Sequence, residues 1–118
     1  MIHITPQTAA AAYELLKTTK PFAQWKLPPA DDIEFKIALD KKEQGHYNRY
    51  VKTDHHWISV SAASVSSLGL LLPVMAHEML HLFQGINKLE TANTEHNAEF
   101  SKIGREVAII HGWDIKAF

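Results

Sequence analysis

This 118-residue sequence lacks cysteine, a large net charge of either sign and a long apolar run. Without cysteine the chain has no disulfide and no thiolate ligand, so a metal site must use nitrogen and oxygen donors. The 12 basic and 13 acidic residues leave a formal net charge of −1, far from the basic surplus of domains that bind phosphate backbones. Global charge therefore gives no support to nucleic-acid binding.

The most apolar stretch, residues 68–82, is short for a bilayer span and is interrupted by Pro73, His77, Glu78 and His81. The first 17 residues contain no basic leader followed by a long apolar segment, in contrast to a secretory signal. We therefore expect no membrane segment and a cytoplasmic protein.

Length and composition are those of one globular domain. A chain of this length buries about two thirds of its unfolded surface in a single core. Its 46% of hydrophobic residues lies close to the globular average, which argues against a disordered chain. No internal repeat or low-complexity linker divides it. We expect residues 1–118 to form a single domain.

Three segments have the pattern of strands. Apolar residues alternate with mostly polar ones in the first, and the other two are rich in aromatic and β-branched residues. The predicted strands are residues 33–39, 46–51 and 55–61, with a turn at residues 41–45 after the first. Together they predict a small, mostly antiparallel sheet.

Two helices are predicted on either side of these strands. Thr5 and Pro6 predict the cap and the first turn of a helix that continues to about Lys17. Its expected packing face consists of Ala9, Ala12, Tyr13 and Leu16. Residues 64–85 have the apolar content of a buried helix that ends at Gly85, and Pro73 either opens this helix or kinks it.

A last helix is predicted over residues 94–112, with Thr94 as the cap in front and Gly112 behind. Its apolar residues recur at three- and four-residue spacing: Phe100, Ile103, Val107 and Ile110. The whole pattern predicts an α+β fold, in which a small sheet packs with an N-terminal helix, a central buried helix and a C-terminal helix.

The central helix carries the sequence HEMLH at residues 77–81. Residues four apart project from one helix face, so His77 and His81 can present nitrogens to a single ion. Glu78, about a third of a turn away, reaches a water on that ion rather than the ion itself. The neighbours on every face are apolar, so these polar groups need partners. The competing interpretation is core packing, with one histidine hydrogen-bonded and the other partly exposed.

A catalytic zinc takes three protein ligands and keeps a fourth position for water. His96, at the start of the predicted last helix, is the best candidate for the third ligand. Glu95 and Glu99 compete with it because carboxylates also bind zinc. The long pattern HExxHxxGxxH does not fit, since Gly85 stands one place too late and residue 87 is asparagine.

The segments VMAHEMLHLFQ (74–84) and EHNAEFSKIG (95–104) resemble the SprT-like zinc metalloproteases, which include the Spartan-type enzymes. In that family the zinc helix carries HExxH, and the third histidine belongs to an H-x-x-[EF]-F-like segment that opens the next helix. HHWISVSAASV (55–65) resembles the strand and polar turn before that helix. The resemblance covers residues 46–110. Asn97 departs from the glycine of many members, and the sequence shows neither the cysteine-rich zinc ribbon nor the basic extensions.

The resemblance implies a zincin-like fold and a peptidase mechanism. One Zn²⁺ ion bound by His77, His81 and His96 would acidify its water and polarise the scissile carbonyl, with Glu78 as the general base. The expected partner is a protein or peptide substrate, and DNA enters through the resemblance alone. The strand at 56–61, if it forms the sheet edge beside the cleft, would pair with an extended substrate.

A second interpretation is a catalytically silent zincin-like binding module in which the metal is structural. The sequence favours the enzyme, because no cysteine is present to close the site and Glu78 occupies the place of a general base. Several other polar and aromatic residues are expected to serve packing, surface or helix-end roles: His55, His56, His111, Tyr47, Tyr50, Trp25, Trp57 and Trp113.

Overall fold

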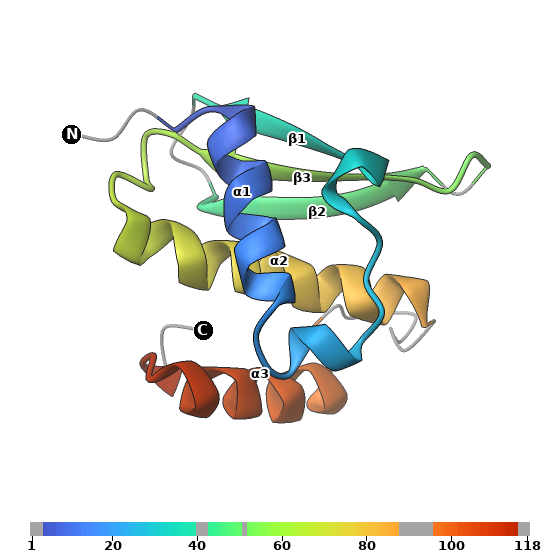
Figure 1. The fold of residues 1–118 in the computed structure, drawn as a ribbon, viewed down its shortest axis with the longest axis vertical. Coiled ribbons are helices and arrows are strands. Elements are labelled where there is room, and N and C mark those ends of the chain that lie inside the picture. The colour runs from blue at the N-terminus through green and yellow to red at the C-terminus, as the bar shows by residue number, and fades with distance from the viewer. Residues whose placement is uncertain (1–3, 40–42, 51, 88–95, 116–118) are drawn as a thin grey trace.

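The computed structural model describes residues 4–39, 43–50, 52–87 and 96–115. Three α-helices and a three-stranded sheet form its α+β fold, as Figure 1 shows. The elements follow in the order α1 (Pro6–Lys17), η1 (Phe22–Gln24), η2 (Ala30–Asp32), β1 (Ile33–Ala38), β2 (Gly45–Tyr50), β3 (His55–Ser61), α2 (Leu68–Ile86) and α3 (Ala98–His111).

The strands form a mixed sheet in the order β1-β3-β2. β1 runs parallel to β3, with Ile33 opposite His56, and β2 runs antiparallel to β3, with Gly45 opposite Val60. The prediction of a mostly antiparallel sheet is therefore wrong for the β1–β3 pair. Burial agrees with this order: Ile58 and Val60 of the central β3 are fully buried, whereas β2 contains no aliphatic side chain and suits an edge.

All three predicted strands are present, with bounds within one residue of those expected. β1 and β2 follow each other in the chain, yet β3 lies between them, so the segment that joins them is not the turn of a hairpin. Residues 40–42 of this segment, which overlap the predicted turn, lie outside the described residues, as does Val51.

α1 crosses the sheet on the face that α2 also covers (Figure 1). It begins as predicted, because the Thr5 side chain accepts a hydrogen bond from the Thr8 amide at 3.1 Å and Pro6 stands in the first turn. The four predicted packing residues are its buried ones: Ala9, Ala12, Tyr13 and Leu16. The Tyr13 ring meets Phe35 of β1 edge-on, with 5.6 Å between centroids. Local signals therefore define α1 and join it to the sheet.

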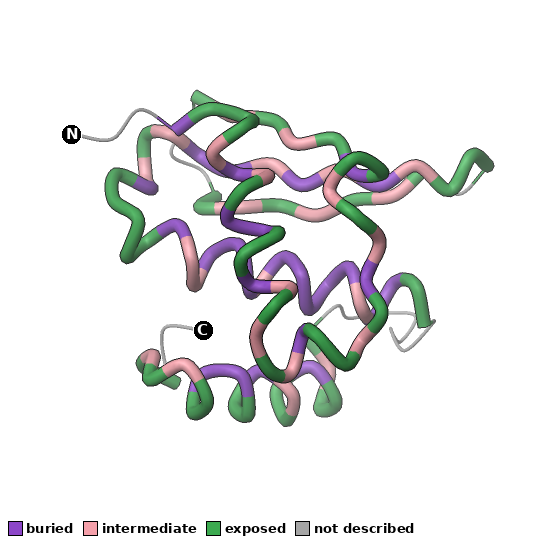
Figure 2. The backbone as a smooth tube through the Cα atoms, in the orientation of Figure 1, coloured by how far each residue is buried: buried purple, intermediate pink, exposed green. Residues whose placement is uncertain are grey.

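α2 is the buried centre of the fold, and Figure 2 shows buried residues along most of its length. It begins after Ser67, whose side chain accepts from the Leu70 amide at 3.2 Å. Pro73 lies inside the helix rather than opening it. A proline there cannot donate to the Gly69 carbonyl, and this loss is tolerated because Gly69 is exposed to solvent.

The predicted stop of α2 at Gly85 is wrong, because the helix continues to Ile86 with Asn87 as its cap. Gly85 has another role, since a Cβ at this position would lie only 3.0 Å from the Tyr47 hydroxyl oxygen on β2. The Gly85 carbonyl also accepts a hydrogen bond from Arg49 of β2 at 3.0 Å. Glycine here allows close strand–helix packing instead of ending the helix.

α3 packs on α2 and ends as predicted at Gly112, which adopts a left-handed φ of 75°. Its observed N-cap is Asn97, while the predicted cap Thr94 lies outside the described residues. Ile110 is 51% exposed, against the prediction, because it lies about 100° around the helix from the middle of the buried face formed by Phe100, Gly104, Val107 and Ala108. Within the described part of the chain, no helix is both long enough and apolar enough to cross a bilayer.

Candidate metal centre

Two of the three candidate ligands come from consecutive turns of α2. His77 and His81 project from the same helix face, and their rings meet edge-on with 4.9 Å between centroids. His81 is 6% exposed and His77 is half-buried, because the sheet and α3 cover most of this helix. The spacing of the HEMLH segment therefore produces the paired imidazoles that it predicts.

The third histidine comes from the segment that leads into α3. His96 Nε2 lies 3.0 Å from His81 Nε2, close to the roughly 3.4 Å between two nitrogen ligands of a tetrahedral zinc. Donor atoms of His77, His81 and His96 all lie within 4.8 Å of one another, close enough to share a metal ion. The packing of α3 against α2 creates this cluster.

Phe100, in the first turn of α3, packs against all three imidazoles. Its ring stacks on His81 with 4.5 Å between centroids and on His96 with 4.6 Å. It also meets His77 edge-on at 5.1 Å. Phe100 is itself buried, so the rings share an apolar support on one side.

Burial keeps the two helix histidines neutral. Burial, together with a smaller contribution from the neighbouring His96, lowers the pKa of His77 to about 4. Burial also lowers the pKa of His81 to about 3, with smaller contributions from His77, His96 and His46. A neutral imidazole is the form that binds metal, so at pH 7 neither side chain has to lose a proton first.

The donor set fits a transition metal rather than calcium or magnesium. Three imidazole nitrogens suit zinc, copper, nickel or iron, whereas Ca²⁺ and Mg²⁺ prefer oxygen ligands. Among the described residues no carboxylate joins the cluster, and the competitor Glu99 is exposed on the first turn of α3. Glu95, the other competitor, lies outside the described residues.

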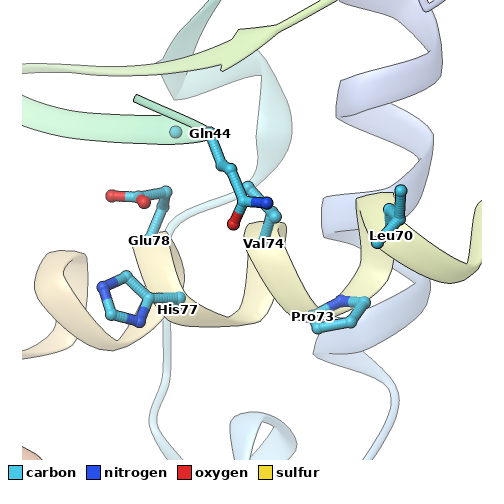
Figure 3. A pocket seen from close by; sticks show the side chains of 7 residues that line it. Gln44, Leu70, Pro73, Val74, His77 and Glu78 are labelled. Carbon is cyan, nitrogen blue, oxygen red and sulfur yellow. The ribbon is translucent and has the colours of Figure 1, made fainter. Parts of the chain in front are cut away.

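The side chain of Glu78 extends from α2 toward Gly45, the first residue of β2. Figure 3 shows its carboxylate on the side of α2 that faces β2, while the His77 ring lies on another side of the same turn. Only 4% of Glu78 is exposed. A Cβ on Gly45 would lie 2.9 Å from Glu78 Oε2 and 2.9 Å from Val74 Cγ1, so the strand approaches the helix closely here. The glycine leaves room for the carboxylate.

A cavity of about 260 Å³ adjoins this carboxylate (Figure 3). His77 and Glu78 form one end of it, and the remainder is lined by Gln44, Gly45, Leu70, Pro73 and Val74. One cavity thus joins a candidate metal ligand, a buried carboxylate and an apolar wall.

The other histidines named from the sequence have hydrogen-bond partners outside the cluster of His77, His81 and His96. His56 Nδ1 lies 2.8 Å from the Tyr47 hydroxyl, and burial lowers the His56 pKa. His55 hydrogen-bonds Glu34 at 2.8 Å, which lowers the pKa of that carboxyl. His111 Nε2 donates to the Lys20 carbonyl at 3.0 Å.

The aromatic residues also serve packing. Tyr47 lies beside Gly85, seven residues or about 10 Å along α2 from Glu78. Tyr50 packs on Trp57 with 4.5 Å between ring centroids, and Trp25 stacks on Phe83 at 4.3 Å. Trp113 stacks on His111 at 4.5 Å.

Sequence reasoning missed three residues that shape the site. Gly45 could have been noticed as a glycine at the start of a strand, which often marks a close backbone approach. Gln84 stands three residues after His81 on the same apolar helix, where a polar residue needs a partner. Phe100 was predicted only as a packing residue of its helix.

No protein-family model matches this chain, and no curated protein matches it. We therefore infer a function from the residues of the site and from the resemblance of its two histidine segments.

Proposed function

We propose that this protein is a zinc-dependent peptidase with a zincin-like active site, in which His77, His81 and His96 bind one Zn²⁺ ion. The observation that carries the proposal is the cluster of three imidazoles beside a cavity that also contains the buried carboxylate of Glu78. Two helical histidines, a third histidine from another segment and a neighbouring glutamate are the components of metal-assisted hydrolysis.

Each residue has a defined task in this proposal. The three neutral imidazoles hold the metal, and Phe100 restricts their ring orientations from one side. When bound, zinc supplies Lewis acidity that acidifies a coordinated water and polarises a carbonyl. Glu78 accepts the proton of the attacking water and returns it to the departing amine. Burial of Glu78 against Gly45 limits the positions that its carboxylate can adopt.

The substrate surface differs from the one that the family resemblance implies. β3 is the central strand, so residues 56–61 are already paired on both sides and cannot bind an extended peptide. β2 is the edge strand beside α2, and its first residue Gly45 borders the cavity. An extended peptide along β2 would place one side chain near the apolar wall formed by Leu70 and Val74.

The alternative of a silent binding module with a structural metal is less well supported. A structural zinc site is closed by four protein ligands, whereas the cluster in the described ranges has three and its third member, His96, is exposed. A structural site would also have no use for a buried glutamate beside the ligands.

The deciding experiment is Glu78→Gln, assayed by elemental analysis and cleavage of unfolded protein or peptide libraries. The wild type is expected to contain one zinc per chain and to cleave peptides. The variant should keep the zinc and the fold but lose at least about 100-fold in kcat, because it has no general base. Glu99→Gln, an exposed carboxylate on α3, is the matched control and should retain activity. Comparable turnover in Glu78→Gln would rule out the mechanism.

Parallel assays with and without single-stranded DNA test the nucleic-acid dependence that the resemblance implies. A rate that DNA leaves unchanged would remove DNA from the proposed function without affecting the peptidase itself.

A further inference from the structure

A second contact between α2 and the segment that leads into α3 lies next to the contact between His81 and His96. Gln84 Nε2 donates to Asn97 Oδ1 at 3.2 Å, and Gln84 is completely buried. Gln84 follows His81 by three residues, and Asn97 follows His96 directly. The amide pair therefore lies one helical turn beyond the pair of imidazoles, with the partners taken from the same two segments.

Asn97 has two hydrogen-bonding roles through a single atom. Its Oδ1 accepts from the Phe100 amide at 2.9 Å, which caps α3, and from the Gln84 side chain. Because both bonds end on Oδ1, the side chain of Gln84 must turn its NH₂ group toward Asn97. The bond thus ties the cap of α3, and with it the backbone next to His96, to the buried face of α2.

This arrangement is costly for the fold. Gln84 Oε1 is buried and has no hydrogen-bond partner among the described residues. A buried acceptor without a partner destabilises a protein more than one neutral hydrogen bond stabilises it. An apolar side chain of similar size would satisfy packing at this position without that penalty, so packing alone does not account for glutamine here.

We propose that Gln84 and Asn97 form a latch that positions His96, the third metal ligand, against the histidines of α2. His96 is exposed, and unlike His77 and His81 it is not held on a buried helix. The latch holds the adjacent residue, so the imidazole has less freedom to lose when a metal binds. This inference rests on the metal site of the proposed function, but not on peptidase activity.

The latch can be tested with three substitutions in the full-length protein. Gln84→Met removes the amide and keeps the size of the side chain. Asn97→Ser keeps the helix cap, because serine is as good an N-cap as asparagine, but is too short for Gln84. Asn97→Asp keeps both the cap and the acceptor for Gln84, so it serves as the matched control. Zn²⁺ affinity is measured by competition with a chromophoric chelator, and site geometry by the visible absorption of bound Co²⁺.

Gln84→Met and Asn97→Ser are each expected to weaken Zn²⁺ binding about 10–100-fold and to alter the Co²⁺ spectrum. Losses of this size are typical when a residue that orients a metal ligand is replaced. The double variant should be no weaker than the weaker single variant, because both changes break one contact. Asn97→Asp should bind at least as tightly as the wild type. The metal-free Gln84→Met protein should unfold at an unchanged or higher temperature, because the unpaired acceptor is gone.

Equal Zn²⁺ affinity in the wild type, Gln84→Met and Asn97→Ser would overturn the latch while leaving the proposed function intact. The same holds if both variants lose thermal stability without a change in affinity or Co²⁺ spectrum, because that result describes a structural contact alone. A wild type that binds no Zn²⁺ would overturn the metal site and the peptidase together. If Gln84→Met does not fold, the contrast between Asn97→Ser and Asn97→Asp decides.

Discussion

Replacing Gly45 with alanine is expected to impair catalysis while leaving metal binding intact. The new Cβ would lie 2.9 Å from Glu78 Oε2 and 2.9 Å from Val74 Cγ1, whereas ordinary van der Waals contact begins at 3.4 Å. The neighbours must therefore move by about half an ångström. Glu78 is 4% exposed and Val74 9% exposed, so neither side chain can turn freely into solvent.

The expected effects on stability and rate follow from this displacement. Overpacking costs about 1–3 kcal/mol, and the reduced entropy of an unfolded chain with alanine returns about 0.4–1 kcal/mol. The free energy of unfolding should therefore fall by about 1.3 kcal/mol, within bounds of about 0 and 2.6 kcal/mol. Moving a general base by a fraction of an ångström should lower kcat about 10-fold or more. Zinc affinity should not change, because the atoms nearest the new methyl group belong to Glu78 and Val74.

Urea unfolding, peptide cleavage and Zn²⁺ competition test the three parts of this prediction. Gly69→Ala is the control, because its Cβ would find Ser67 Oγ at 3.8 Å as its nearest neighbour on an exposed helical turn. Alanine there should stabilise the protein by up to about 1 kcal/mol and leave kcat unchanged. Wild-type stability and turnover in Gly45→Ala would refute the reasoning, as would an equal loss of activity in the control.

Two further predictions concern the histidines. In metal-free protein, His77 and His81 should lower the free energy of unfolding as the pH drops from 6.5 toward 4 and should leave it unchanged at higher pH. Their pKa values are lowered to about 4 and 3, so only the unfolded chain takes up protons in this range. The free energy of unfolding should fall by at most about 1.4 kcal/mol per pH unit for each histidine, and by less where solvent reaches the ring. A free energy of unfolding in urea that does not change between pH 7 and pH 5 would contradict this prediction. For the ligand set, His96→Ala should remove bound zinc in elemental analysis and Glu99→Ala should not, and the reverse result would mean that the third ligand is misassigned.

The elements that sequence reasoning placed correctly depend on local signals. α1 has the predicted bounds and the predicted buried face, because its cap, its first-turn proline and its four-residue spacing act within one or two turns. The end of α3 at Gly112 also depends on a local signal, since it requires only a residue that tolerates a positive φ.

The elements that it misjudged depend on distant parts of the chain. Strand order and direction depend on how the connections run and on how the strands pair with one another, and neither appears in the pattern of a single strand. Gly85 matched the pattern of a helix stop, yet its role depends on Tyr47, which lies 38 positions earlier in the sequence. A local pattern cannot distinguish these two uses of glycine.

The residues of the site likewise separate into those that local spacing predicts and those that only tertiary contacts bring together. The sequence alone determined that His77 and His81 share a helix face with Glu78 beside them, because helical geometry follows from spacing. It left His96, Glu95 and Glu99 as competing third ligands. Only the packing of α3 on α2 brought His96 rather than Glu99 into the cluster, because the distance between side chains of separate helices depends on the contacts that join those helices. That packing also placed Gln84 against the cap of α3, a contact that no spacing in the sequence predicts.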